Sequence, residues 1–284
     1  MQSLVQIPAE EMAFIQEAAK YLESPSFLMR VADFIGEPLQ KIGNAIVPAK
    51  VAEYGNEALN KVMTIAISTI PNNQPESEVE KGYLESGWAG LWHRVAVSVT
   101  GGIAGAFGLP GLAIELPVTT AILFRSIASI AGEYGENLAS SEVRMECLSV
   151  FCHGGPGASD DAMESSYLTS RLAMAALIEK SATFIAGKSA EAVSEAIAKG
   201  TAPTLVNLMN KIMSQFNIAV SQKYIAQSLP LISIASGAAI NNAFAGHFNS
   251  VAKYHFGIRK LERKYGQDIV FEAYNQEKKL FKKK

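Results

Sequence analysis

Two long stretches without a charged residue dominate the hydropathy pattern of this chain. The first, VAVSVTGGIAGAFGLPGLAI, covers Val95–Ile114, and the second covers Tyr224–Ala252. About 20 apolar residues suffice to cross a bilayer, and small residues in such a run let helices approach each other closely. A helix that is apolar on every side is equally typical of the core of a large soluble domain. The pattern therefore leaves lipid and protein core open as surroundings.

The rest of the chain repeats its apolar residues at helical spacing, and no alternating strand pattern is present. We therefore expect an all-α fold: a single multi-helix domain with two apolar, small-residue-rich central segments. The expected helices are Pro8–Tyr21, Pro25–Gly36, Pro38–Glu53, Ala52–Ile70, Trp88–Phe107, Leu112–Tyr134, Ser140–Cys152, Ser166–Gly187, Ser189–Lys199, Pro203–Leu229, Asn249–Tyr265 and one that begins near Asp268.

Proline and glycine residues set the expected boundaries. Gly108–Gly111 is expected to break the first apolar stretch, so that Pro117 falls in the first turn of the next helix. Ser140 is expected to cap the helix that reaches Cys152. The organisation that follows is an N-terminal helix in residues 1–24, an all-α domain in 25–266 and a basic C-terminal helix in 267–284.

Composition favours a protein with more apolar surface than a small soluble domain needs. Of the 284 residues, 18% are charged and 49% are hydrophobic, whereas about 25% charged is typical. The two cysteines, Cys147 and Cys152, are too few for a disulfide framework and indicate a reducing compartment. The N-terminal segment carries Glu10 and Glu11 and no basic region, so we expect no signal peptide and a cytoplasmic location.

Charge is distributed unevenly along the chain. Residues 253–284 hold ten Lys or Arg and four Asp or Glu, whereas the other 252 residues hold fifteen basic and twenty-three acidic residues. A basic tail gains about 1 kcal/mol per Lys or Arg near an anionic membrane, but a solvated helix end explains it as well. The acidic body disfavours nucleic acid. The candidate membrane contacts are Lys278, Lys279, Phe281, Lys282, Lys283 and Lys284.

Glu115 is the first candidate for chemistry, because it is a lone carboxylate between two apolar segments. A buried ion without a partner is very costly. Arg125 lies ten residues further on, and Asn241 and Asn242 are the natural partners from the second apolar stretch. The functional interpretation is a polar site for a head group, an ion or a substrate. The structural interpretation is a buried clasp or a helix-start cap, and it is the simpler one.

The sequence contains no motif for catalysis or for a metal. His247 and His255 are eight residues apart, roughly 12 Å along a helix, and Cys147, Cys152 and His153 lack a C-x-x-C spacing. We expect Cys147 in the core and the pair Cys152 and His153 at a helix end. The chain also has no G-x-S-x-G and no phosphate-loop glycines. No catalytic residue, metal or cofactor is therefore expected.

Several segments in a fixed order resemble the EcsC family. They are the stretch from GWAGLWHRV through the Glu115-Leu116-Pro117 turn to Arg125-Ser126-Ile127, then Tyr134-Gly135-Glu136 and EVRMECLSVFCHGG. Downstream come Lys223, Leu229-Pro230, Gly237-Ala238-Ala239, Asn241 and AKYHFGIRKLERKYG. The resemblance covers roughly residues 20–275. It implies membrane association and no established catalytic activity, and the family takes its name from a protein encoded beside an ABC transporter.

Three functional hypotheses follow. The first is a non-catalytic, membrane-associated or lipid-binding helical protein that meets an anionic membrane peripherally. The second is a soluble all-α, hydrolase-like enzyme with a polar site in an apolar pocket around Glu115, Arg125, Asn241 and His247. The third is a regulatory partner of an ABC transporter. The candidate ligand-binding or buried polar cluster is Glu115, Arg125, Lys223, Asn241, Asn242 and His247.

Overall fold

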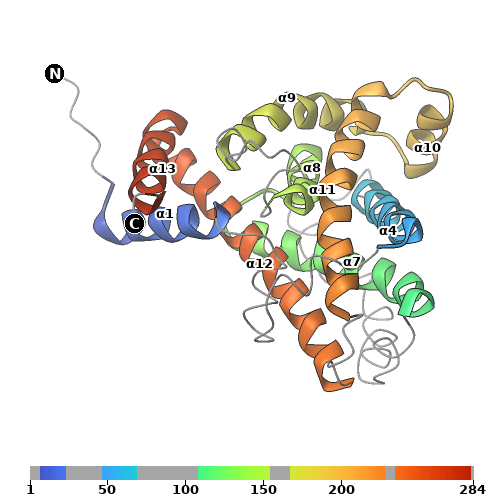
Figure 1. Cartoon of the computed structure of the whole chain (residues 1–284). Helices are drawn as coiled ribbons and strands as arrows, with labels where there is room; N and C mark the ends of the chain where they lie inside the picture. Colours follow the sequence, from blue (N-terminus) through green and yellow to red (C-terminus); the bar gives the residue numbers. More distant parts are fainter. Residues whose placement is uncertain (1–6, 24–46, 69–107, 154–166, 228–233, 283–284) are drawn as a thin grey trace.

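A computed structural model describes residues 7–23, 47–68, 108–153, 167–227 and 234–282 of the chain. Throughout these ranges the protein is all-α and has no strand, which confirms the expected fold class. The helices labelled in Figure 1 are α1 (Ala9–Leu22), α4 (Ala49–Ser68), α7 (Gly108–Glu133), α8 (Ser141–Ser149), α9 (Tyr167–Ile185), α10 (Ala190–Ala198), α11 (Pro203–Gln227), α12 (Ile234–Tyr265) and α13 (Gln267–Lys282). A short 3-10 helix, η2 (Val150–Cys152), extends α8.

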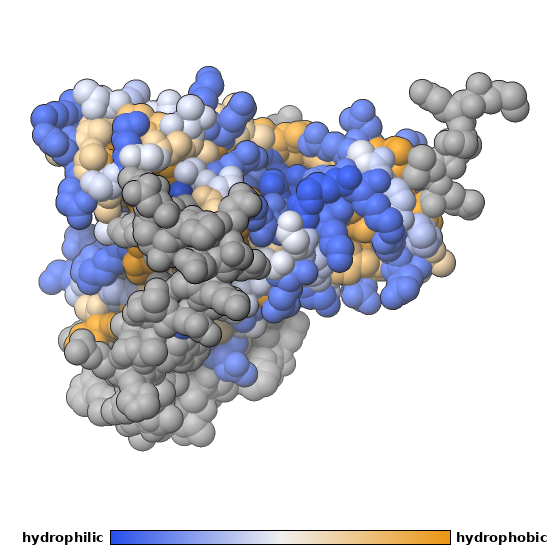
Figure 2. Space-filling model, turned by 180° about the vertical axis from the view of Figure 1, so that it is seen from behind, coloured by the Kyte–Doolittle hydropathy of each residue, from blue (hydrophilic) through white to orange (hydrophobic). Residues whose placement is uncertain are grey.

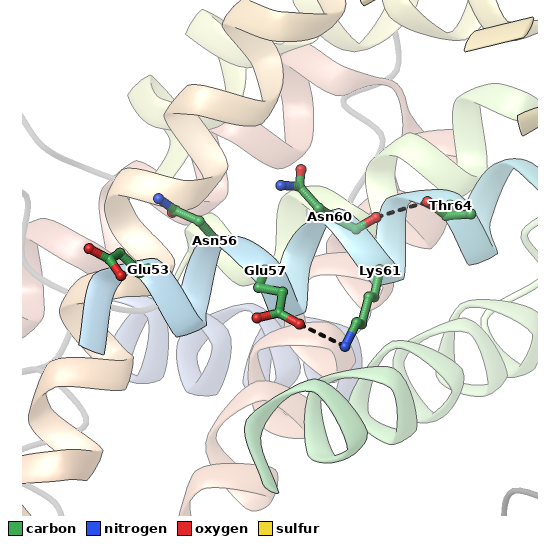
Figure 3. A pocket seen from close by; sticks show the side chains of 6 residues that line it. All are labelled: Glu53, Asn56, Glu57, Asn60, Lys61 and Thr64. Atoms are coloured by element: carbon green, nitrogen blue, oxygen red, sulfur yellow. Dashed lines mark hydrogen bonds and ion pairs between the residues drawn. The ribbon is translucent and has the colours of Figure 1, made fainter. Parts of the chain in front are cut away.

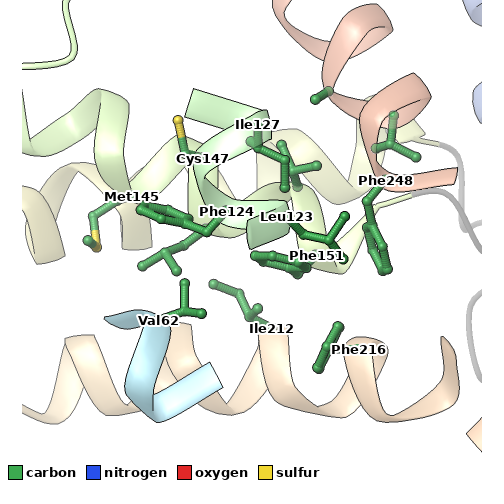
Figure 4. Close-up of a cluster of buried hydrophobic side chains, with 14 of the residues drawn as sticks. Val62, Leu123, Phe124, Ile127, Met145, Cys147, Phe151, Ile212, Phe216 and Phe248 are labelled. Carbon is green, nitrogen blue, oxygen red and sulfur yellow. The ribbon is translucent and has the colours of Figure 1, made fainter. Parts of the chain in front are cut away.

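The core lies where α4, α7, α8, α11 and α12 meet. Helix α4 packs against α7 and α11, and α12 packs against α7. The apolar side chains of these helices point toward one another in Figure 4. Phe151 contacts both Phe216 and Phe248, each at 5.2 Å between ring centroids. Large aromatic side chains of this kind dominate the energetics of a core, so the aromatic cluster fixes α11 and α12 relative to α8.

Helices α1 and α13 lie side by side at one end of the molecule, against α12 (Figure 1). Helix α12 ends at Tyr265, and Gly266 follows with a φ of +94°. Its N–H donates to the carbonyl oxygen of Glu262, 2.8 Å away. Glycine adopts this left-handed conformation without a steric penalty. The Tyr265-Gly266 boundary expected from the sequence is therefore confirmed.

Ser140 caps α8 as expected. Its hydroxyl accepts a hydrogen bond from the backbone N–H of Glu142 at 3.2 Å, which satisfies one of the free donors of the first turn. The helix continues through η2 to Cys152, so its end also agrees with the sequence. Cys147 is fully buried in the core, where we expected it.

Two expected boundaries are wrong. Gly108–Gly111 is not a loop but forms the start of α7, and Pro117 lies inside that helix and not in its first turn. The first N–H groups of a helix have no partner within it, so Pro110 is tolerated there. Helix α12 begins at Ile234 instead of near Asn249 and runs for 32 residues. Its buried Ile240, Phe244 and Phe248 continue one apolar face through the charge-free segment. Residues 95–107, with the glycines at 101 and 105, lie outside the described residues.

One segment among the described helices is long and apolar enough to cross a membrane. It is Gly111–Glu133 of α7, in which 44% of the most apolar window is buried. Core helices of soluble proteins pass the same test. On the face drawn in Figure 2, hydrophilic side chains predominate over the described surface, and hydrophobic ones form separate areas between them. The segment by itself therefore does not establish a membrane span.

Candidate functional site

Glu115 and Lys223 form a buried ion pair between α7 and α11. The Lys223 Nζ donates to Oε1 of Glu115 at 2.5 Å. The Lys223 side chain is fully buried, and the Glu115 side chain retains 8% exposure. The sequence pointed to asparagines as partners for Glu115. The structure supplies a lysine instead, which neutralises the carboxylate as burial requires.

Helix α12 completes the surroundings of this pair. The Lys223 ammonium lies 5.0 Å from the centroid of the Phe244 ring, within the range of a cation–π interaction. Burial lowers the pKa of Lys223, and the neighbouring Glu115 carboxylate opposes this shift. Side chains from α7, α11 and α12 therefore meet at one buried lysine.

The pair leaves some of its hydrogen-bonding capacity unused. Oε2 of Glu115 is buried and has no hydrogen-bond partner among the described residues. An ammonium group has three N–H donors, and Glu115 Oε1 accepts one of them. Buried polar atoms in native proteins nearly always have hydrogen-bond partners. The unpaired Oε2 of Glu115 is therefore a candidate position for a bound group.

The other residues of the expected cluster lie in varied surroundings. Arg125 is half-buried on α7, Asn241 is half-buried on α12, and Asn242 is exposed. His247 is buried beside α1, where the Tyr21 hydroxyl donates to its carbonyl oxygen at 3.4 Å and the two rings lie 6.4 Å apart. Of the expected cluster, Glu115 and Lys223 are thus the two residues that we find in direct contact with each other.

The expected membrane contacts of the tail are partly engaged inside the molecule. Lys278 lies 3.1 Å from Oε2 of Glu23, and its side chain is 15% exposed. Lys279 is exposed. Phe281 and Lys282 belong to the last turn of α13, whereas Lys283 and Lys284 lie outside the described residues.

A charged cleft of about 700 Å³, which was not predicted from the sequence, lies between α8, α9 and α12. Arg171 is held by both carboxylate oxygens of Glu262, at 2.7 and 2.6 Å. Arg259 bridges Glu136 and Glu146 at 2.8 Å each. The lining residues are Glu142, Glu146, Arg171, Leu172, Ala175, Ala176, Ile178, Glu179, Arg259, Glu262, Arg263 and Gln267. These guanidinium groups already bind carboxylates, so a ligand in the cleft can bind them only if one of these ion pairs breaks.

A buried histidine cluster, formed by His153, His255, Glu146 and Tyr167, adjoins the cleft, which Glu146 also lines. His255 Nε2 is 3.2 Å from Oε2 of Glu146, and His255 Nδ1 is 2.9 Å from the Tyr167 hydroxyl. Burial opposes ionisation of Glu146, but His255 and Arg259 outweigh it and lower its pKa to about 2. A carboxyl with so low a pKa is a weak general base at neutral pH. The cluster therefore resembles a structural clasp more than a catalytic relay.

The sequence does contain a signal for these charged residues. Glu262 and Arg263 lie three and four residues after Arg259 on one helix, the spacing at which side chains are neighbours. They fall in AKYHFGIRKLERKYG, and Glu146 falls in EVRMECLSVFCHGG, both of which carry the family resemblance. The sequence alone does not show that these two segments pack against each other in the fold.

A shallow hollow on α4 has no comparable chemistry. Figure 3 shows its six polar side chains, all from this helix. Lys61 pairs with Glu57 at 2.8 Å, each being 56% exposed, and Thr64 donates to the carbonyl oxygen of Asn60 at 3.1 Å. These are the contacts of a solvated helix surface.

Comparisons with known proteins give one match. Neither a search of curated proteins nor a search of solved structures found a similar chain. The model of the EcsC protein family matches residues 11–261, a range that holds the Glu115–Lys223 pair, the histidine cluster and most of the residues that line the charged cleft. With most of its length matched, this chain belongs to the EcsC protein family.

Proposed function

We propose that this protein is a non-catalytic, membrane-associated helical protein that binds lipid through α7 from the cytoplasmic side. The observation that carries the proposal is an apolar ridge on this helix, formed by Ile114, Val118 and Ile122. Ile114 is 77% exposed, and the other two are half-buried. Residues four apart lie one above the other on a helix, so the three form one stripe.

Apolar side chains presented in a row are suited to the boundary between head groups and acyl chains. Fully burying an exposed side chain the size of Ile contributes about 1.5–3 kcal/mol. Ile114 can gain most of this and the already partly buried Val118 and Ile122 only a part, so the ridge gives weak, reversible binding. The basic tail supplies a second contribution if Lys279 and the residues after it reach anionic lipid. Two weak signals together are what a peripheral protein needs for stable attachment.

Vesicle flotation of the whole chain tests this proposal. The probes are vesicles of phosphatidylcholine alone and vesicles that also contain phosphatidylserine. We expect flotation with both, stronger with the anionic vesicles and weakened there by salt. The double substitution Ile114→Glu with Val118→Glu should abolish flotation with phosphatidylcholine.

Leu172→Glu provides the matched control. Leu172 is 51% exposed but lies on α9, away from the proposed ridge, so this variant should float like the unsubstituted protein. Equal loss of flotation in the control and in the ridge variant would overturn the assignment to α7. A chain that stays at the bottom with both kinds of vesicle would overturn membrane association itself.

The alternative functions have less support. Neither the charged cleft nor the hollow on α4 is lined by Glu115, Arg125, Asn241 or His247, so neither of these two cavities favours an enzyme built on these four residues. Regulation of a membrane transporter is compatible with membrane association, but it rests on the family resemblance alone. We therefore retain lipid binding as the proposed function.

A further inference from the structure

The Glu115–Lys223 pair presents one acceptor and spare donors at the same place. Oε1 of Glu115 is taken by Lys223, and Oε2 is buried without a hydrogen-bond partner among the described residues. The Lys223 ammonium is fully buried and has more N–H groups than the one contact uses. An occupant that satisfies both must accept from the ammonium and donate to Oε2.

The charges of the pair select against ionic occupants. The ammonium and the carboxylate are 2.5 Å apart, so together they carry no net charge. An anion that binds Lys223 is repelled by Glu115 at a similar distance, and a cation that binds Glu115 is likewise repelled by Lys223. A hydroxyl group meets neither difficulty, because its oxygen accepts and its O–H donates.

The apolar ridge lies on the same helix as Glu115 and next to it in sequence. Glu115 directly follows the exposed Ile114, and its own side chain retains 8% exposure. Val118 and Ile122 follow on the same helix and are half-buried. A molecule with a hydroxyl at one end and an acyl chain at the other can therefore satisfy the pair and cover the ridge at once.

We propose that the Glu115–Lys223 pair binds the free hydroxyl group of a neutral, acylated lipid such as a diacylglycerol. The inference rests on the proposed lipid binding and names the ligand class for it. The acyl chains lie along Ile114, Val118 and Ile122, and the hydroxyl bridges Lys223 Nζ and Glu115 Oε2. Phospholipid head groups, which carry a phosphate, fit the pair less well.

Binding of two matched ligands tests the proposal. Dioctanoylglycerol carries the hydroxyl, and in its O-methyl ether a methyl group replaces the donated proton while the acceptor oxygen remains. Binding followed by tryptophan fluorescence or by protein NMR should be roughly ten- to a hundredfold weaker for the ether, the usual cost of leaving a buried acceptor unpaired. Free glycerol, which has the hydroxyl without the chains, should not compete. Equal binding of the ether overturns the proposal, and so does equal competition by glycerol.

Two variants separate the pair from the fold. Glu115→Gln leaves Lys223 unopposed, so its preference should shift from dioctanoylglycerol toward dioctanoyl phosphatidic acid. The double substitution Glu115→Leu with Lys223→Met replaces the pair by apolar side chains, which proteins tolerate well. It should float with vesicles yet bind the alcohol and the ether equally.

The outcomes distinguish this proposal from the general one. Flotation without discrimination between alcohol and ether in the unsubstituted protein would remove the hydroxyl site and leave membrane association standing. Discrimination without flotation would keep the site and remove membrane association. A double variant that folds by circular dichroism and still discriminates would also overturn the role of the pair.

Discussion

His153 is stacked on His255, with ring centroids 5.4 Å apart and ring planes inclined by 23°. Both rings are buried, and neither nitrogen of His153 has a hydrogen-bond partner among the described residues. Tyr167, Glu146, Arg171 and Arg259 surround the two rings from α9, α8 and α12. Burial lowers the pKa of both histidines, to about 3 for His153, and the nearby His255 adds to the effect because two adjacent rings repel each other when both are protonated.

The stability of the protein should therefore fall in weak acid. A histidine whose folded pKa is lowered stays neutral in the folded chain, while the unfolded chain takes up a proton below about pH 6.5. The contribution of the two neutral histidines to the free energy of unfolding is fully present above that pH. It is lost progressively as the pH falls toward 3. Glu146, with its pKa lowered to about 2, adds a further loss only below about pH 4.5.

Urea unfolding at pH 7, 6, 5 and 4.5 measures this dependence. We expect the free energy of unfolding to fall by up to about 1.4 kcal/mol per pH unit for each histidine that stays neutral. His153→Phe keeps the stacked ring and removes the titration, so its pH slope should be shallower and its stability at pH 7 equal or higher. An unchanged slope in this variant would show that His153 is not the titrating group.

Local chemistry predicted a good part of the fold. The Ser140 cap and the Gly266 boundary depend on neighbouring residues, and both are where the sequence places them. The start of α12 was missed because the packing of Phe244 and Phe248, which carries the helix through the charge-free segment, is a tertiary property. Helix propensity alone does not predict stabilisation by tertiary packing.

The candidate site was predicted only in part, for the same reason. The sequence identifies Glu115 as a carboxylate that needs a partner, but its partner Lys223 is 108 residues away. Likewise Arg171 and Glu262 are 91 residues apart, and the segment that contains Glu262 gives no indication that its partner is Arg171. Which of many charges meet is decided by how the helices pack, and one sequence does not contain that information in readable form.

Separating Arg171 from Glu262 should destabilise the protein strongly. Each side chain is 10% exposed, and both oxygens of Glu262 bind the guanidinium. Removing one partner of a buried pair costs about 3–5 kcal/mol, because the other charge is left uncompensated. Arg171→Met should therefore lower the free energy of unfolding by about this amount, measured by urea denaturation.

A surface pair provides the comparison. Lys199 and Glu195 lie 2.5 Å apart and are 66% and 64% exposed, so Lys199→Met should leave the unfolding midpoint nearly unchanged. Adding Glu262→Leu to Arg171→Met should restore most of the lost stability. If the single Arg171 variant unfolds like the Lys199 variant, the cleft pair contributes no more than a solvated contact.

Gly257 should be required for the seating of α1 on α12. A β-carbon at this position would lie 2.2 Å from Cζ of the Phe14 ring, and that ring also contacts Tyr254 at 5.6 Å. Gly257→Ala should therefore displace Phe14 and cost about 1–3 kcal/mol, the usual range for overpacking. Amide hydrogen exchange should show the loss of protection in α1 first.

A second substitution checks that Phe14 is the cause. Phe14→Ala removes the ring that the new methyl group would meet, so the double variant should be less destabilised than the two single changes added together. Simple additivity would mean that Gly257→Ala acts on α12 itself and not through its contact with α1.

Glu23 should hold α13 against the rest of the molecule. Its Oε1 accepts from the Tyr167 backbone N–H at 3.2 Å and from the Tyr274 hydroxyl at 3.3 Å, and its Oε2 pairs with Lys278 at 3.1 Å. Glu23→Ala leaves the buried Tyr274 hydroxyl and Lys278 without this partner, which costs about 1–3 kcal/mol for each such group that stays buried. We expect α13 to open locally, with faster hydrogen exchange and faster tryptic cleavage after Lys278 and Lys279.

The same variant tests whether the tail contributes to membrane binding. Once Lys278 is released, it can meet anionic lipid together with Lys279, so Glu23→Ala should float more strongly with phosphatidylserine vesicles and unchanged with phosphatidylcholine. Glu277, which accepts from Gln16 at 2.9 Å on the exposed side of the same two helices, is the matched control. Glu277→Gln keeps an acceptor oxygen there and should leave hydrogen exchange in α13 nearly unchanged. Faster exchange without stronger flotation would assign the Lys278–Glu23 contact to the fold alone.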